Sequence, residues 1–226
     1  MTHKPMMSDE AARRKIAWQE KVHQDNLTRR KRLVLCFWGR RIVVSRNVFA
    51  PGPPKYNLLA RAVLKEARKT DKVLDMGTGS GLQAILAASK GASVTAVDVS
   101  PFAVKCAKLN VKRNRLSSHV EVMKSDLFDQ VKGRFDLIIF DPPFRWTKPR
   151  DWLERSSADK NYRTLISFFS SARKYLNDSG RILMTFGTSG DITYFRHLIR
   201  KNGFKSKRLL RKSHSGWTYF AYRLTC

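Results

Sequence analysis

Cysteine is scarce in this sequence: Cys36, Cys106 and Cys226 are the only three in 226 residues, and they lie far apart. An odd, dispersed set fits neither a disulfide framework nor a zinc motif, and it is typical of a reducing compartment, so we expect a cytoplasmic protein. The five histidines also lack the spacing of metal ligands, and we expect no metal site. No run approaches the roughly 18 apolar residues of a membrane span. The N-terminus lacks the apolar stretch of a secretory signal. We therefore expect no membrane partner.

Acidic side chains are scarce as well: 18 Asp and Glu stand against 45 Lys and Arg, a net charge of +27. Residues 71–141 hold ten basic and eight acidic side chains, whereas residues 192–226 hold nine basic and none acidic. A basic surface that flanks a nearly neutral region is typical of a nucleic-acid partner. A generally basic, solvated face is the alternative interpretation. We expect RNA as the partner, ribosomal RNA first, with a ribosome-associated protein as the alternative.

A proline-rich segment, residues 50–54, divides the chain into two parts. Before it, residues 8–32 favour a helix with a thin apolar face that ends in the basic run 29–32, and residues 33–38 and 42–45 read as a β-hairpin. We predict a small basic N-terminal extension of helix and hairpin, residues 1–50, and a main domain, residues 51–226.

The main domain alternates strand-like with helix-like segments, a pattern typical of an α/β fold with a mostly parallel sheet and helices on both faces. Seven strands are expected, at residues 73–76, 93–97, 120–124, 135–140, 181–186, 205–210 and 218–224. The last two, joined by a turn at residues 213–216, form an antiparallel edge. Helices are expected at residues 58–69, 82–90, 101–114, 158–176 and 191–201.

A glycine-rich loop follows the first of these strands. Gly77, Gly79 and Gly81, with Thr78 between the first two, form a G-x-G-x-G pattern, which is tighter than the G-x-G-x-x-G of dinucleotide sites. Strand, glycine loop and helix together present backbone N–H groups to a small ligand. The tighter loop suits a smaller, zwitterionic tail, and Asp75 just before it can lie opposite an ammonium group.

Carboxylates close the next two strands. Asp98 is placed to accept both ribose hydroxyls of a nucleoside. Asp126 can accept from an adenine amino group, and Leu127 can cover the ring; a solvated acid at a strand end is the alternative reading of Asp126. A ligand with an amino-acid tail, a ribose and an adenine is S-adenosyl-L-methionine, the cofactor that we expect.

The tetrad Asp141-Pro142-Pro143-Phe144 follows another buried strand and carries the candidate chemistry. An amide NH₂, or an exocyclic NH₂ on a base, is a poor nucleophile that improves when acceptors hold its two hydrogens. Asp141 supplies a side-chain acceptor and Pro142 its carbonyl. Pro142 and Pro143 stiffen the loop, and Phe144 offers a face for stacking.

Basic and aromatic side chains follow the tetrad directly: Arg145, Trp146, Lys148, Arg150 and Trp152. Cations interleaved with tryptophans suit phosphate contact together with base stacking, so we expect substrate binding here. The alternative is that both tryptophans anchor the loop to the domain.

Four stretches in this order and spacing, DMGTGSG, AVDVS, SDLF and DPPF, resemble class I methyltransferases. The resemblance covers about residues 55–205. It implies a Rossmann-like, seven-stranded fold and S-adenosyl-L-methionine as the cofactor, bound by the strand-end residues named above.

Within this class, the tetrad is similar to the D/N-P-P-Y/F motif of enzymes that methylate planar nitrogens, such as HemK-like glutamine methyltransferases and their small-domain rRNA relatives. The glutamine enzymes carry Asn and Tyr where this chain has Asp141 and Phe144, and a longer N-terminal helical domain. The resemblance therefore implies first methylation of an exocyclic amino group of an RNA base, adenine N6 or guanine N2. The alternative is a protein N5-glutamine methyltransferase. A non-catalytic RNA-binding protein is a third interpretation, against which the carboxylates at positions 75, 98 and 141 argue.

Overall fold

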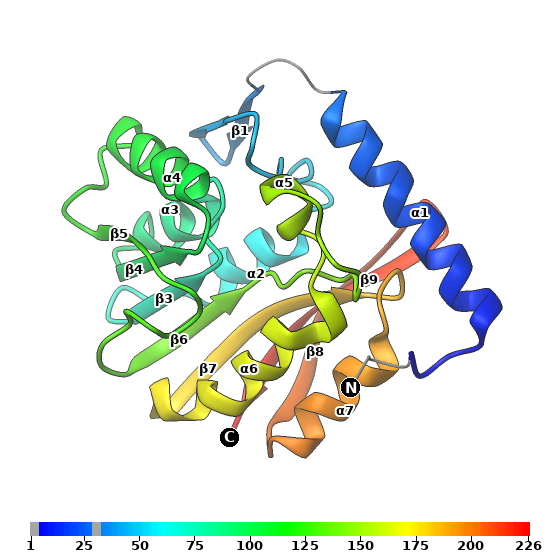
Figure 1. Cartoon of the computed structure of the whole chain (residues 1–226). Coiled ribbons are helices and arrows are strands. Elements are labelled where there is room, and N and C mark those ends of the chain that lie inside the picture. The colour runs from blue at the N-terminus through cyan, green and yellow to red at the C-terminus, as the bar shows by residue number, and fades with distance from the viewer. Residues whose placement is uncertain (1–4, 29–32) are drawn as a thin grey trace.

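A computed structural model describes residues 5–28 and 33–226 (Figure 1). The basic run expected at the end of the first helix, residues 29–32, lies outside the described residues. The helices are α1 Asp9–Leu27, α2 Leu58–Glu66, α3 Leu82–Ala88, α4 Pro101–Arg113, α5 Trp152–Arg155, α6 Arg163–Ala172 and α7 Ile192–Lys201. The strands are β1 Leu33–Phe37, β2 Arg40–Val44, β3 Lys72–Met76, β4 Ser93–Asp98, β5 Val120–Lys124, β6 Phe135–Phe140, β7 Leu176–Gly187, β8 Lys205–His214 and β9 Trp217–Thr225.

The main sheet has seven strands in the order β5-β4-β3-β6-β7-β9-β8. The first five are parallel, and β9 and β8 add the antiparallel edge that the sequence predicts. From β3 the chain moves outward through β4 and β5, then returns to place β6 on the other side of β3. The strand order thus reverses between β3 and β6, and α/β sheets bind ligands at the carboxyl edge of such a point.

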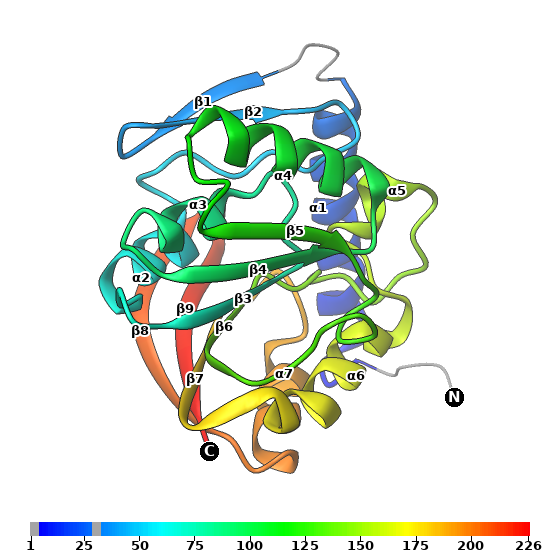
Figure 2. The same ribbon diagram turned by 90° about the vertical axis from the view of Figure 1, so that its left-hand side faces the viewer.

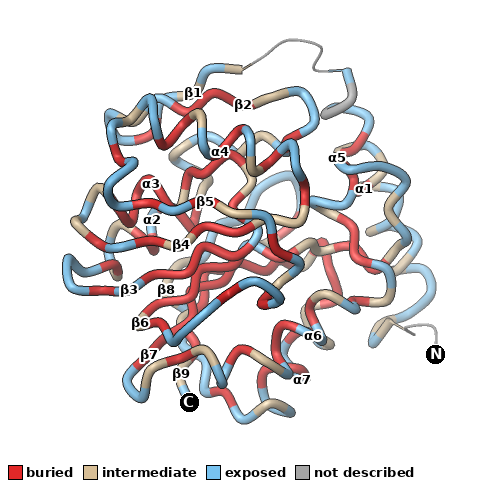
Figure 3. The backbone as a smooth tube through the Cα atoms, turned by 60° about the vertical axis from the view of Figure 1, so that its left-hand side comes forward, coloured by how far each residue is buried: buried red, intermediate tan, exposed pale blue. Residues whose placement is uncertain are grey.

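Helices cover both faces of this sheet, so the expected fold class is confirmed (Figure 2). On one face α2, α3 and α4 pack on alternate strand residues, and on the other face α6 and α7 do the same. The central strands are buried along their length, as Figure 3 shows. No helix among residues 5–28 and 33–226 is long and apolar enough to cross a membrane.

The N-terminal hairpin β1-β2 forms as the sequence predicts and packs against α4. The backbone N–H of Val43 donates to Oδ1 of Asn110 at 2.9 Å, and Nδ2 of Asn110 donates to the Val43 carbonyl at 2.7 Å. The buried Phe37 and Ile42 join the same apolar core as α2 and α3. The hairpin is therefore held by the same apolar core as the main domain.

Helix α1 lies beside the loop that follows β7 (Figure 1). Its thin apolar face is supplemented by polar contacts: Nε2 of Gln19 donates to the Ser189 carbonyl at 2.7 Å, and Nζ of Lys15 donates to the Gly190 carbonyl at 2.8 Å. The rings of Trp18 and Trp217 are 6.5 Å apart. These contacts fix α1 to the carboxyl side of the sheet.

The prediction of one long helix over residues 158–176 is wrong in its bounds, since only residues 163–172 form an α-helix. Asn161 and Tyr162 both have left-handed backbone angles, with φ of 58° and 54°, so an α-helix cannot run through them. Instead the Asp159 carboxylate accepts from the backbone N–H groups of Thr164 and Leu165, and α6 begins only at Arg163. Strand β7 then begins at Leu176, earlier than expected.

Candidate functional site

The glycine loop and the tetrad meet at the point where the strand order reverses. Met76, the last residue of β3, pairs with Phe140, the last residue of β6. Gly77 and Asp141 therefore leave adjacent strands side by side. A Cβ placed on Gly77 would lie 3.6 Å from the Phe140 ring, so the loop passes closely over the end of β6. The glycine loop and the tetrad therefore lie at the same edge of the sheet.

The glycine loop needs glycine for its backbone conformation. Gly77, Gly79 and Gly81 have φ of 66°, 55° and 83°, a left-handed region that side chains disfavour. Gly81 also packs against α4, because a Cβ there would lie 3.2 Å from Ala107. Around Gly79, in contrast, the nearest atom to such a Cβ is a backbone oxygen 4.0 Å away. The loop therefore leaves space beside its backbone at Gly79, which is half-buried, while Gly77 is exposed.

Asp75 holds this loop from beneath. Its Oδ2 accepts from the Thr78 hydroxyl at 2.6 Å and from the Ala84 backbone N–H at 3.0 Å, so it joins the loop to the start of α3. The residue is only 2% exposed. Asp75 and Thr78 therefore shape the glycine loop. The direct contact of Asp75 with an ammonium group stays a prediction.

Asp98 lies at the end of β4 and faces the same loop. Its Oδ2 accepts from the Gly79 N–H at 2.9 Å, and its Oδ1 accepts from the Ser100 N–H at 2.9 Å. A carboxylate oxygen has more than one lone pair, so both oxygens retain capacity to accept from ribose hydroxyls. Asp98 is thus fixed in orientation at the position where a nucleoside is expected.

Burial raises the pKa values of the carboxylates in this site, although the charge of Arg155 opposes the rise at Asp98. Burial, together with the smaller effect of the charges of Asp98 and Asp141, raises the pKa of Asp75 to about 7 against the hydrogen bonds from Thr78 and Ala84. Burial also raises the pKa of Asp98. A cationic ligand stabilises such carboxylates in their charged form. S-adenosylmethionine carries an ammonium and a sulfonium, so the donor set fits this cofactor although the chain as a whole is strongly basic.

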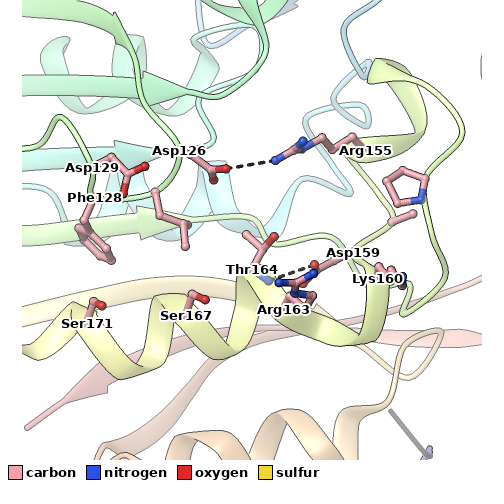
Figure 4. Close-up of a pocket in the computed structure, with 13 residues that line it drawn as sticks. Asp126, Phe128, Asp129, Arg155, Asp159, Lys160, Arg163, Thr164, Ser167 and Ser171 are labelled. Carbon is pink, nitrogen blue, oxygen red and sulfur yellow. Dashed lines mark hydrogen bonds and ion pairs between the residues drawn. The ribbon is translucent and has the colours of Figure 1, made fainter. Parts of the chain in front are cut away.

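A cavity of about 500 Å³ opens beside Asp126 and Leu127 (Figure 4). Arg155 of α5 reaches across it and pairs with Asp126 at 3.3 Å. Residues of α6, among them Thr164, form the opposite wall. Leu127 has a left-handed φ of 46°. The two residues expected to hold the adenine therefore line a real cavity, but Asp126 already has a cationic neighbour that the sequence did not indicate.

Asp141 is held by β7. The Thr185 hydroxyl donates a hydrogen bond to Oδ1 of Asp141. Asp141 as a whole residue is exposed, but protein atoms surround its carboxylate. This desolvation raises the pKa of the carboxylate to about 6. The Thr185 hydrogen bond opposes that rise, since it stabilises the charged form.

The carbonyl of Phe144, at the end of the tetrad, is also fixed. The buried Tyr162 hydroxyl donates to it at 2.8 Å, and the same hydroxyl accepts from the Asp191 N–H at 2.9 Å. The Phe144 ring lies 4.8 Å from the Phe186 ring. Pro142 is buried and Pro143 half-buried between these anchors. The tetrad is therefore tied to its surroundings at both ends.

Of the five residues expected to bind substrate after the tetrad, Arg145 and Trp146 are buried, at 4% and 8% exposure. Nη1 of Arg145 pairs with Oε1 of Glu154 at 3.3 Å, and the Trp146 ring lies 6.1 Å from the Tyr162 ring. Both side chains therefore anchor the segment. For Trp146 this agrees with the alternative interpretation of the tryptophans, and the phosphate contact expected of Arg145 is corrected to a structural role.

The other three residues lie nearer the surface. Arg150 is paired with Glu154 at 2.8 Å and with Glu20 of α1 at 2.9 Å, so its charge is already compensated. Lys148 is exposed, and Trp152 is 39% exposed with the Arg155 guanidinium 5.6 Å from its ring centre. Lys148 and Trp152 keep the expected substrate role as a prediction.

Thr185, Tyr162 and Arg155 are functional candidates that sequence reasoning missed. Each acts through a partner that is distant in the chain: Asp141 lies 44 residues from Thr185, Phe144 18 from Tyr162 and Asp126 29 from Arg155. No local motif marks them. Among the described residues, no cluster of three or more His, Cys, Asp or Glu could hold a metal ion.

Comparison with known proteins adds a family and relatives. A family described as methyltransferase small domain matches residues 41–198. The release factor glutamine methyltransferase of Shewanella oneidensis is 33% identical over 67% of this chain and 57% of its own length. The ribosomal protein uL3 glutamine methyltransferase of Francisella tularensis is 29% identical over 68% of this chain and 54% of its own. The chain thus spans about half the length of these curated relatives.

Solved structures share the fold. The tRNA m1G37 methyltransferase of M. jannaschii aligns with a TM-score of 0.63 and 19% identity, over 87% of this chain and 57% of that one. At this identity the likeness concerns architecture: the same sheet with helices on both faces.

Proposed function

The chain belongs to the methyltransferase small domain family, and from the names of its relatives we propose that it methylates the side-chain amide nitrogen of a glutamine in a protein of the translation apparatus. The Rossmann-like fold predicted from the sequence and the S-adenosylmethionine cofactor agree with this family. The proposal concerns the acceptor and the roles of individual residues.

The pairing of Met76 with Phe140 is the structural observation that supports methyl transfer at this site. It sets the exposed backbone of the glycine loop beside Asp141, so a methyl donor on the loop and an acceptor on the tetrad would be neighbours. Such positioning is the main contribution that a protein makes to an in-line displacement.

Each element has a role in this reaction. The cofactor, when bound, supplies an electrophilic methyl group on sulfur. Asp98 and the loop around Gly79 hold and orient the donor. Asp141 and the Pro142 carbonyl accept the two hydrogens of the amide NH₂, which raises the electron density on its nitrogen. Once the amide nitrogen had taken the methyl group in exchange for its bond to sulfur, it would release one proton, for which Asp141, with a pKa of about 6, is a nearby acceptor.

The names of the relatives favour glutamine over the RNA base that the sequence placed first. The two relatives described above each cover about two thirds of this chain, and both are named as glutamine methyltransferases, one of a release factor and one of a ribosomal protein. A ribosome-associated acceptor also gives the positive charge a use, because ribosomal RNA would attract the basic ends of the chain.

An exocyclic amino group of an RNA base is the second candidate acceptor. Asp141 and Phe144 favour it, since the resemblance assigns Asn and Tyr to these positions in glutamine enzymes. The net charge of +27 favours it as well. The two acceptors are chemically alike, as both present a planar NH₂ with a delocalised lone pair.

A transfer assay separates the two. The protein is incubated with methyl-labelled cofactor and, separately, with ribosomal proteins, release factors and ribosomal RNA. The proposal expects label in protein, at glutamine after peptide mapping. Label confined to RNA would establish the second candidate instead.

A further inference from the structure

Gly187 ends strand β7, and its backbone does not adopt the left-handed conformation for which glycine is usually required. Glycine weakens a strand unless something approaches it closely. Here the ring of Tyr219 does: a Cβ on Gly187 would lie 2.7 Å from Cε1 and 3.2 Å from Cγ of that ring. The absence of a side chain at position 187 therefore makes room for the Tyr219 ring.

The face of the sheet on which the Tyr219 ring lies follows from the register. Gly187 and Tyr219 are directly opposite in the β7-β9 pair, so their Cβ atoms point to the same face. Thr185 is two residues before Gly187 and faces the same way. Because the Thr185 hydroxyl bonds to Asp141, the Tyr219 ring lies on the face that holds the Asp141 carboxylate.

The ring also meets the tetrad. The centres of the Tyr219 and Phe144 rings are 6.1 Å apart with an angle of 27° between their planes. Both residues are half-buried, so part of each ring remains accessible. Phe144 packs on Phe186 of the other face, so its ring and that of Tyr219 meet at the carboxyl edge of the sheet and form one aromatic wall, defined by these two residues, at the end of the sheet where Asp141 lies.

We propose that Tyr219, seated over Gly187, is an acceptor-binding residue that packs against the planar amide group and the side chain that carries it. The inference rests on the proposed function, because it assumes that Asp141 holds the acceptor NH₂. Phe144 belongs to the motif, whereas Tyr219 comes from the antiparallel edge, 75 residues further along the chain. The second half of the acceptor site is therefore supplied by β9.

A purely structural role makes a different prediction. Aromatic residues opposite a strand glycine can stabilise a sheet without touching a ligand. In that case loss of the ring would lower stability and would leave the affinity for the acceptor unchanged. An acceptor-binding role predicts a change in KM for the acceptor with cofactor binding intact.

The first experiment compares Tyr219→Leu and Tyr219→Phe with the wild-type protein. We expect Tyr219→Leu to raise the acceptor KM about fivefold, as for loss of one aromatic contact, while Tyr219→Phe stays near wild type. The cofactor Kd, measured by calorimetry, should not change. Tyr222→Leu is the matched control, because Tyr222 lies on the same strand but on the opposite face and is 3% exposed. It should lower the melting temperature and spare the acceptor KM.

The second experiment keeps Tyr219 and moves its ring. Gly187→Ala places a methyl group where the ring lies, so it should raise the acceptor KM by a similar factor. The double variant Gly187→Ala/Tyr219→Leu should be no worse than either single variant, since both remove the same contact. Additive effects would mean that Gly187 acts independently of the ring.

Failure of this inference is distinct from failure of the proposed function. The wild-type protein is assayed first on the glutamine acceptor and on RNA. If only RNA is methylated, the proposed function falls, and the same variants are then read on RNA. If the wild-type protein is active and both Tyr219→Leu and Gly187→Ala keep the acceptor KM unchanged, the role of Tyr219 is overturned.

Discussion

Met76 and Phe140 are paired neighbours at the ends of β3 and β6, and this pairing joins the two halves of the site. The glycine loop begins directly after Met76, and the tetrad begins directly after Phe140. The loop contributes backbone and the tetrad contributes a carboxylate held by Thr185. Donor and acceptor sites are thereby set next to each other by strand register.

Replacing Asp141 tests its role as hydrogen-bond acceptor. Asp141→Ala should lower kcat by about two to three orders of magnitude, since one preorganised polar group is lost. Asp141→Asn keeps a side-chain oxygen but loses the charge and the proton acceptor, so its activity should fall between those of the wild-type protein and Asp141→Ala. Steady-state kinetics with a parallel titration of cofactor measures both, and cofactor Kd should stay constant. Undiminished turnover in Asp141→Ala would remove this residue from the reaction.

The pH dependence of turnover should follow the Asp141 carboxylate. Desolvation raises the pKa of this carboxylate to about 6. Only its charged form accepts from both the Thr185 hydroxyl and the acceptor NH₂, so kcat should fall as the pH drops through about 6. Thr185→Val removes a hydrogen bond that lowers this pKa, so the acid limb should move to higher pH, whereas Thr185→Ser should leave it in place. In Asp141→Asn the limb should disappear. A limb that persists there belongs to another group.

Asp98 should govern the affinity for the cofactor. Asp98→Ala should weaken binding by about 1–3 kcal/mol, the cost of losing hydrogen bonds to a charged group. The variant also leaves the Gly79 N–H without its acceptor, which loosens the glycine loop. Calorimetric titration with the cofactor measures the effect, and an unchanged Kd would exclude Asp98 from the cofactor site.

How much of this site the sequence predicts depends on the distance between partners. The strand ends with Asp75, Asp98 and Asp141 are local signals, because each acid follows a short apolar run. The hydrogen bond between Thr185 and Asp141 depends on strand order, which places β7 beside β6. The residues around Asp141 and Thr185 do not indicate that β7 lies beside β6, so this hydrogen bond could not be predicted from the sequence.

The segment after the tetrad shows the same limit. Arg145 and Trp146 look like surface residues in the sequence, since a cation beside an aromatic ring is typical of nucleic-acid binding. Glu154 lies nine residues away and turns the pattern into a buried ion pair. The broken helix at Asn161 was missed because the capping role of Asp159 depends on the fold of this segment.

Breaking the buried ion pair between Arg145 and Glu154 should destabilise the fold. Glu154→Ala leaves the Arg145 guanidinium buried without its carboxylate, which costs about 3–5 kcal/mol. Urea denaturation measures the loss. Glu20→Gln is the matched control, because it removes an exposed partner of Arg150 and should move the midpoint little. Equal stability of Glu154→Ala and wild type would refute a structural role for Arg145.

The basic edge strand β8 should contribute to ribosome binding. Its cations are exposed, and Lys205→Glu, Lys207→Glu and Arg211→Glu together should lower the slope of log K against log salt by about 2 if the three contact phosphates. Filter binding to ribosomal RNA at several salt concentrations gives the slope. Reversal of the exposed Lys105 and Lys108 on α4 serves as the control. An unaltered slope would mean that β8 is only a solvated face.

The most direct test of the central claim is methyl transfer from labelled cofactor to defined acceptors: separated ribosomal proteins, release factors and ribosomal RNA, each with wild-type protein and with Asp141→Ala. The account predicts label on a glutamine side chain of one protein, and its loss in Asp141→Ala. Label in RNA alone, or transfer to glutamine that survives Asp141→Ala, would contradict it.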